Sequence, residues 1–600
     1  MSRHPFAAAL ALAALTLAPA AARAAQVWVA GATEKILPDA SPRGDVEARL
    51  GAARNEFEAF QVVVTGAAGH VSAKASPLTG PGTLDDVKLF REDLIQLQHP
   101  SSSDGGTGAW PDALVPDVDD VVGEQRNAFP FDVRDGQSRA IWVEVRVPPD
   151  ARPGTYHGSV SVNSSQRSWS VPVALEVWDF QLPSTASLRS SFGLSYGGTI
   201  SGHHLAGEAN SRLRARYALL ALDHRISLTG ISDDGSNGLD DFDQYFGALM
   251  DGTAPTRLPR ARLTAAKYIG DETSVDEHAR WAQHFHDHGW FDRLFDYVCD
   301  EPPLTCRWGD INARGRAAHG ADPRFRTLVT TQIWDARDHA VDRDIDIMVP
   351  VVNWTDDKPG SPMAGDQRSR YDGFLASGDD KEVWLYQSCM SHGCGGTVDI
   401  GDPSADDRYF TGWPSYMIDA SAARNRAMEW LSFLERASGE LYWETTAGYA
   451  HDPWSNLWDF SGNGDGTLFY PGTPSRIGGR TDIPVASIRL KMIREGMEDY
   501  EYLKRVADLG DRENATRIAR DLFPNAYSTE LEPARLMSAR AQLATRILQL
   551  EGKPVPADAT LGAASPGGGG GGGCSTGGAG EALGLLLWPA LVLLRRSRRR

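Results

Sequence analysis

Two adjacent carboxylates, Asp300 and Glu301, are the residues of this sequence best suited to acid–base chemistry. They follow an apolar run of strand length within residues 294–303 (LFDYVCDEPP). Pro302 favours an extended or polyproline-like conformation at Glu301, and Pro303 stops the strand because it has no N–H to donate. The pair is therefore predicted where a strand opens into a loop, which is the catalytic face of a β/α barrel. An acidic turn without a catalytic role is the simpler alternative.

The elements that would position this pair alternate between strands and helices from Pro183 onward. Strands are predicted at residues 187–195, 226–232, 262–269, 292–300, 325–333, 344–353, 382–389 and 439–449. Helical periodicity is found at residues 205–224, 274–288, 421–436 and 484–508, with Pro484 in the first turn of the last helix. This alternation predicts a TIM-like (β/α)8 barrel over residues 183–508, with Asp300 and Glu301 at the end of its fourth strand.

The rest of the chain divides into flanking segments. Residues 25–182 contain short strands and Pro- or Gly-containing turns, which predict a β-sandwich domain; residues 100–130, rich in Ser, Gly, Asp and Pro, are predicted to be a long loop. Residues 509–556 are expected to form C-terminal helices that pack on the barrel. The fold class is thus a multidomain β plus α/β protein: a β-sandwich, a barrel and terminal helices.

Both ends of the chain carry targeting patterns. Residues 1–24 have a basic start, an Ala/Leu run and a small-x-small cleavage site, as in a secretion signal peptide. Residues 557–573 end in seven consecutive glycines and are read as a flexible linker. Residues 574–600 begin with Cys574 and contain a short apolar run and an Arg cluster. This tail resembles the sorting tails on surface proteins of myxobacteria, which implies processing near Cys574; a plain single-pass anchor is the alternative.

The four cysteines of the body allow three complete pairings: Cys299, Cys306, Cys389 and Cys394. Export permits disulfides, and short-range pairing of Cys299 with Cys306 and of Cys389 with Cys394 is the simplest arrangement. Metal ligation is the competing interpretation, but both spacings are looser than those of ordinary zinc sites. No metal site and no cofactor is predicted.

The composition indicates which kinds of molecule this protein can bind. The formal net charge is −19 over 600 residues, and both ends carry an excess of arginine, so the body is more acidic still. Nucleic acid is therefore excluded as a partner, because phosphate binding needs clustered Lys and Arg. A content of 17 Trp suits carbohydrate surfaces. A membrane is expected to be contacted only through the tail, and the oligomeric state is not predicted.

Several stretches together resemble glycoside hydrolase family 123 and the related domain-of-unknown-function family 4091. They span roughly residues 45–510 and comprise residues 53–61 (ARNEFEAFQ), 153–156 (PGTY), 297–302 (YVCDEP), 439–443 (GELYW), 464–472 (GDGTLFYPG) and 494–503 (REGMEDYEYL). The resemblance implies a retaining exo-β-N-acetylgalactosaminidase, or a near relative, that uses the acetamido group of its own substrate as nucleophile. Glu301 is expected to be the general acid and Asp300 to orient the acetamido group and stabilise the cationic intermediate.

Four further residues near predicted strand ends are candidates for stacking on a sugar or bonding its hydroxyls: Trp334, Asn353, Tyr386 and Trp443. The equally plain interpretation is that they are core or barrel-layer residues. The sequence therefore predicts an exported glycosidase, at the cell surface (outer membrane) or extracellular, with a glycan substrate and a tail that sorting machinery processes. The alternatives are a carbohydrate-binding surface protein without turnover, and a glycosidase for sugars without an acetamido group.

Overall fold

Two sheets form the N-terminal part of the chain. The computed structural model describes residues 24–230, 238–389 and 407–556, all within one compact unit, Met1–Ala564. One sheet has the order β1 (Gln26–Gly31), β3 (Glu56–Thr65), β10 (Ser138–Val147), β7 (Val87–Leu97) and β8 (Gly108–Pro116). The other has the order β2 (Ala48–Arg54), β12 (Ser168–Gln181), β11 (Gly154–Asn163), β4 (Ala68–Ala75) and β9 (Phe131–Val133), with the short β5 (Leu78–Thr79) and β6 (Thr83–Leu84) at its side. The strands of both sheets pair antiparallel except for β2 and β12, which are parallel.

The two sheets share one apolar core, to which both contribute inward-facing residues such as Val62 and Leu175. This is the arrangement of a β-sandwich, as the strand pattern predicted. The long loop predicted at residues 100–130 is wrong in part, because β8 lies within it and pairs with β7 along its length. Cross-strand pairing here overrides a composition that is typical of loops.

The second part of the chain is a nearly closed barrel of eight parallel strands. In sequence order these are β13 (Arg189–Gly193), β14 (Leu228–Thr229), β15 (Ala266–Lys267), β16 (Leu294–Cys299), β17 (Arg326–Val329), β18 (Ile347–Met348), β21 (Glu382–Tyr386) and β22 (Gly439–Tyr442). The first and last strands, β13 and β22, pair with each other, whereas β14 and β15 stand at the two ends of the ladder and do not pair with each other in the described residues. Apolar side chains such as Phe295, Leu328, Ile347 and Trp384 fill the interior, so the barrel is a packed core.

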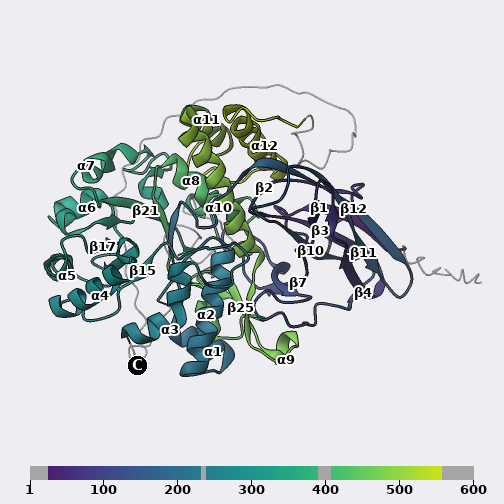
Figure 1. Ribbon diagram of the computed structural model, residues 1–600, viewed down its shortest axis with the longest axis horizontal. Helices are drawn as coiled ribbons and strands as arrows, with labels where there is room; N and C mark the ends of the chain where they lie inside the picture. Colours follow the sequence, from purple (N-terminus) through teal and green to yellow (C-terminus); the bar gives the residue numbers. More distant parts are fainter. Residues whose placement is uncertain (1–23, 231–237, 390–406, 557–600) are drawn as a thin grey trace, which may run out of the picture. The chain divides into compact units, whose positions relative to one another are not determined.

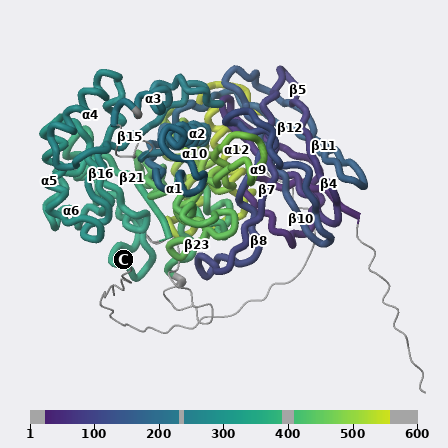
Figure 2. Tube along the Cα trace, turned by 90° about the horizontal axis from the view of Figure 1, so that it is seen from below, coloured from purple at the N-terminus to yellow at the C-terminus, as the bar shows by residue number. Residues whose placement is uncertain are grey.

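Helices cover the barrel, and α4, α5 and α6 lie outside β15–β17 in both views (Figures 1 and 2). The helices are α1 (Tyr196–His203), α2 (Glu208–Asp223), α3 (Gly238–Asp251), α4 (Val275–Asp287), α5 (Trp308–Ala321), α6 (Ile333–Asp338), α7 (Asp372–Leu375), α8 (Met428–Leu434), α9 (Pro474–Ile477), α10 (Ile488–Val506), α11 (Arg512–Leu522) and α12 (Pro533–Leu550). In the described part of the chain no helix has the length and apolar character needed to cross a membrane. The fold class predicted from the sequence is confirmed.

Helix α10 begins four residues later than predicted. Ser487 is its N-cap, and the Ser487 hydroxyl accepts a hydrogen bond from the N–H of Leu490 at 3.1 Å. Pro484 is not in the first turn but in β26 (Ile483–Ala486), which pairs with β25 (Phe469–Gly472). The serine cap and the hairpin therefore decide the start of the helix.

Candidate active site

Asp300 and Glu301 lie just beyond the end of β16, at the carboxyl-terminal face of the barrel. A disulfide joins Cys299, the last residue of β16, to Cys306, with the two Cα atoms 5.9 Å apart. This pairing was predicted from the spacing, and it closes the chain into a small loop around the two carboxylates. The Thr305 hydroxyl also donates to the backbone carbonyl of Asp300 inside that loop.

Glu301 does not have the extended conformation that Pro302 predicted. Its φ is +43°, in the left-handed region, and the N–H of Leu304 donates to its carbonyl at 2.8 Å to make a turn. The N–H of Glu301 donates to Thr330 Oγ1 at 2.7 Å. The disulfide and this bond to the neighbouring strand override the local preference. Such a backbone costs about 1–3 kcal/mol in a non-glycine residue and is concentrated at functional sites.

Asp300 is held by hydroxyl groups of β16 and of the residue that follows β17. Its Oδ1 accepts from the Tyr297 hydroxyl at 2.7 Å and from Thr330 Oγ1 at 2.9 Å. Burial, and then the neighbouring Asp300 carboxylate, raise the pKa of Tyr297 well above its ordinary value, so the phenol stays protonated and keeps donating. Asp300 is itself exposed, and its Oδ2 makes no hydrogen bond to any described residue. One carboxylate oxygen is thus fixed while the other faces solvent.

Glu301 is held from a different strand. The hydroxyl of Tyr386, the last residue of β21, donates to Glu301 Oε1 at 2.6 Å. Tyr386 is buried and packs among the residues that fill the barrel interior. Of the four predicted sugar-binding residues, Tyr386 is the one that contacts the carboxylate pair in the described part of the chain, and it positions an acid group rather than serving as an open stacking surface.

Trp443 directly follows β22 and is 37 % exposed. Its ring meets that of Phe460, 48 % exposed, edge to face with centroids 4.9 Å apart. The indole N–H points to Asp465 Oδ1 at 3.4 Å, and that oxygen also accepts from the Tyr442 hydroxyl at 3.0 Å. Burial raises the pKa of Asp465 to about 6. Trp443 and Phe460 therefore form an exposed aromatic pair, and Asp465 positions the indole ring of Trp443.

Asn353 and Trp334 are placed differently from the prediction. Asn353 is buried, and its amide donates to the Tyr409 hydroxyl at 3.1 Å. Trp334 lies in α6 rather than at the end of β17, and its ring packs edge to face on Trp354 with centroids 5.6 Å apart. The guanidinium of Arg370 covers the Trp334 ring at 5.7 Å. For both residues these contacts favour the packing interpretation over direct contact with a sugar.

Tyr297 and Asp465 lie in two stretches that carry the family resemblance, but neither they nor Thr330 and Phe460 were predicted as site residues. Tyr297 lies three residues before Asp300 on the same strand. Thr330 follows Val329, which is the register partner of Cys299, so the parallel ladder places it beside Asp300. Strand register could have found both hydroxyls, whereas Asp465 depends on a loop that returns to the barrel from a distance in sequence.

The remaining predicted site residues are cysteines. Cys389 is buried near the end of β21. Its predicted partner Cys394 lies outside the described residues, as does Cys574, so this pairing and the tail processing stay predictions.

Glu444 is a further carboxyl group at this face of the barrel. It is buried and accepts hydrogen bonds from the N–H groups of Ser195, Thr445 and Thr446.

Two family models match the sequence. The Glycoside hydrolase 123 N-terminal domain matches residues 94–164, and the Glycoside hydrolase 123 catalytic domain matches residues 408–506. A comparison with curated protein sequences gave no match.

Among solved structures, a family 123 glycoside hydrolase from Clostridium perfringens, analysed for glycolipid glycan hydrolysis, superposes with a TM-score of 0.60 at 13% identity. The match covers 88% of this chain and 98% of that one. An FMN-binding β-glucuronidase from Facaelibacterium prausnitzii L2-6 gives a TM-score of only 0.26 at 9% identity, over 79% of this chain and 61% of that one.

The barrel and the family matches define the class of this protein as a glycoside hydrolase. More narrowly, residues 94–164 and 408–506 match the models of the N-terminal and catalytic domains of glycoside hydrolase 123, so the resemblance to that family is confirmed.

Proposed function

We propose that this glycosidase removes terminal β-linked N-acetylhexosamine, with N-acetylgalactosamine as the first sugar to test, by a retaining mechanism in which the acetamido oxygen of the substrate is the nucleophile. The observation that carries the proposal is the separate fixation of two consecutive carboxyl groups at the catalytic face. Thr330 and Tyr297 hold Asp300, and Tyr386 holds Glu301. The family 123 relative, studied for glycolipid glycan hydrolysis, adds support for a glycan substrate.

Consecutive residues are poorly suited to conventional retention. Their Cα atoms are only about 3.8 Å apart, so both side chains approach a bound sugar from the same stretch of backbone. A conventional retaining enzyme needs its acid and its nucleophile on opposite sides of the scissile bond, with about 5–5.5 Å between the carboxyl groups. An acetamido oxygen attached to the sugar removes the need for the second carboxylate.

The roles of the two residues follow from their surroundings. Glu301 protonates the departing oxygen as general acid and then activates water as general base. Asp300 presents Oδ2 to the acetamido N–H, while its Oδ1 stays fixed by the two hydroxyls. When the acetamido oxygen bonds to the anomeric carbon, it forms a cyclic oxazolinium ion. The anionic Asp300 side chain then stabilises the positive charge of this ion. No carboxylate forms a covalent bond to the sugar in this scheme.

Replacing the 2-acetamido group of the substrate by hydroxyl is expected to reduce hydrolysis below detection. The change removes an intramolecular nucleophile, and well-oriented intramolecular groups reach effective concentrations of about 10⁵–10⁸ M. The measurement compares release of 4-nitrophenol from the β-N-acetylgalactosaminide, the β-N-acetylglucosaminide and the plain β-galactoside. The acetamido sugars should react and the galactoside should not. Comparable rates on the galactoside would refute the substrate-assisted mechanism, even if glycosidase activity itself were established.

We also propose that the protein is exported and held at the cell surface by residues 574–600. The basic, apolar signal at residues 1–24 and the combination of glycines, Cys574, apolar run and Arg cluster support this proposal. A chain that ends before Cys574 is expected to be released into the medium with its glycosidase activity intact. Immunoblotting of washed cells and medium measures the outcome. Continued retention of the shortened chain on the cells would show that the tail is not the anchor.

A further inference from the structure

The barrel has a seam between β14 and β15. These strands are neighbours in the barrel, but they are the two ends of the hydrogen-bonded ladder in the described residues. A cavity of about 10 Å³ lies at this position, lined by residues of both strands and by Phe242 of α3. Helix packing from outside, rather than backbone pairing, must therefore hold the barrel together along this line.

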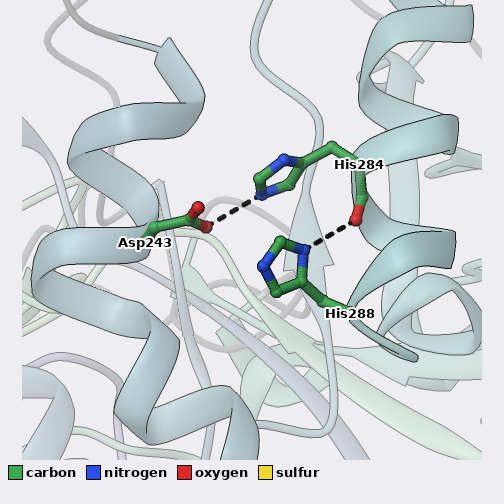
Figure 3. Close-up of side chains that lie close together, drawn as sticks. All are labelled: Asp243, His284 and His288. Carbon is green, nitrogen blue, oxygen red and sulfur yellow. Dashed lines mark hydrogen bonds and ion pairs between the residues drawn. The ribbon is translucent and has the colours of Figure 1, made fainter.

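An aromatic cluster joins α3 to α4 outside the seam. The Phe242 ring lies 5.3 Å from that of Phe285 and 6.3 Å from that of Trp281, both on α4. The next residue of α3, Asp243, stands at the edge of this cluster and faces two histidines, His284 of α4 and His288 directly after it (Figure 3).

These three side chains converge. His284 Nε2 lies 2.8 Å from Asp243 Oδ1. His288 Nδ1 donates to the backbone carbonyl of His284 at 2.9 Å, and its Nε2 makes no hydrogen bond to any described residue. The two imidazole rings are four residues apart on one helical face, with centroids 4.4 Å apart. One nitrogen or carboxylate oxygen from each residue lies within 4.8 Å of the others.

We propose that Asp243, His284 and His288 bind one divalent transition-metal ion of the zinc class and thereby clip α3 to α4 across the seam. Two imidazole nitrogens and one carboxylate oxygen are ligands that Zn²⁺ accepts, with a water in the fourth position. Calcium and magnesium select oxygen ligands instead. His288 is exposed at the end of the helix, and its ring, which stacks on Trp290 with centroids 4.4 Å apart, must shift to bring the ligand atoms to the roughly 2.0–2.2 Å bonds that zinc requires.

The competing interpretation is a simple ion pair between His284 and Asp243 without a metal ion. Helix α4 carries a second histidine in such a pair, which serves as a matched control. His286 of α4 pairs with Asp322 at 2.8 Å and stacks on Phe291. It thus has the same pairing and a similar half-buried setting, but it belongs to no cluster of three ligands in the described residues.

The test titrates untagged, chelator-treated full-length protein with ZnCl₂ by calorimetry. The wild type and His286→Ala are expected to bind one ion per chain with equal affinity. His288→Ala and Asp243→Asn should bind at least about 10–100-fold more weakly, since a loss of that size follows even when a group that only orients a ligand is removed. Equal affinity in His288→Ala and the wild type, or no binding by the wild type, would overturn the proposal.

Two further readouts exclude a trivial loss through misfolding. Co²⁺ in place of Zn²⁺ should give visible absorption typical of a four-coordinate site in the wild type and in His286→Ala, but not in His288→Ala. Added Zn²⁺ should raise the thermal midpoint of the same two proteins and leave that of His288→Ala unchanged. An equal rise in all variants would place the ion elsewhere and refute this site.

Discussion

Glu301→Gln is expected to lower kcat about 10²–10⁴-fold on an N-acetylhexosaminide with a poor leaving group, because that is the usual contribution of general acid catalysis. Glutamine keeps the shape of the side chain and can still meet the Tyr386 hydroxyl, so the geometry of the site should persist. A substrate with a good leaving group, such as 4-nitrophenol, needs less protonation and should lose less in its first step.

Asp300→Asn provides the contrast to Glu301→Gln. The oxazolinium charge develops whatever the leaving group, so this variant should lose turnover on both kinds of substrate. Asp521→Asn, on the exposed surface of α11, is a control that should leave kcat unchanged. The measurement is the initial rate of each variant on both substrates, and the thermal midpoint of each variant confirms that it is folded. Full activity of Glu301→Gln on the poor leaving group would place the active site elsewhere.

The barrel was predictable from the sequence because its strands are apolar runs separated by periodic helices. All eight predicted strands are present, although each is shorter than expected. The predicted boundaries failed where contacts distant in sequence decide the structure. Pro484 pairs in a hairpin instead of starting α10, and β8 forms from a segment with the composition of a loop.

The candidate site was predictable in its chemistry and less so in its geometry. Asp300 and Glu301 could be selected because an acidic pair at a strand end is a recognisable pattern. The conformation of Glu301 could not, since its backbone is fixed by Thr330 and by the disulfide rather than by Pro302. Trp334 shows the converse error, because a strand predicted four residues too long moved it from a helix to a strand end.

Helix α10 was predicted from its helical periodicity, but it buries most of its charged side chains along with its apolar ones. The central example is Glu144 of β10, which is fully buried. Its carboxylate lies 2.7 Å from Lys491 Nζ, 2.7 Å from an Arg494 nitrogen and 2.8 Å from an Arg257 nitrogen. One carboxylate thus joins the sandwich to α10 and to the segment before β15. Residues so far apart in sequence give no local signal of this cluster.

Glu144→Gln is expected to destabilise the fold by about 3–5 kcal/mol, because removing one partner leaves buried charges uncompensated. Burial alone would raise the pKa of Glu144, but Arg494, Lys491 and Arg257 hold it well below its ordinary value of 4.5. The stabilisation is therefore complete above about pH 4.5 and is lost as the pH falls through the depressed folded-state pKa.

Urea denaturation followed by tryptophan fluorescence, at neutral pH and at a series of acid pH values, measures both effects of this variant. The wild type should lose stability relative to Glu144→Gln as the solution is acidified, because the variant has no carboxylate to protonate. Asp521→Asn breaks an exposed pair with Arg517 on α11 and should cost no more than about 0.5 kcal/mol. If Glu144→Gln costs as little as this control, the buried cluster does not fasten the sandwich to α10, and apolar packing alone must do so.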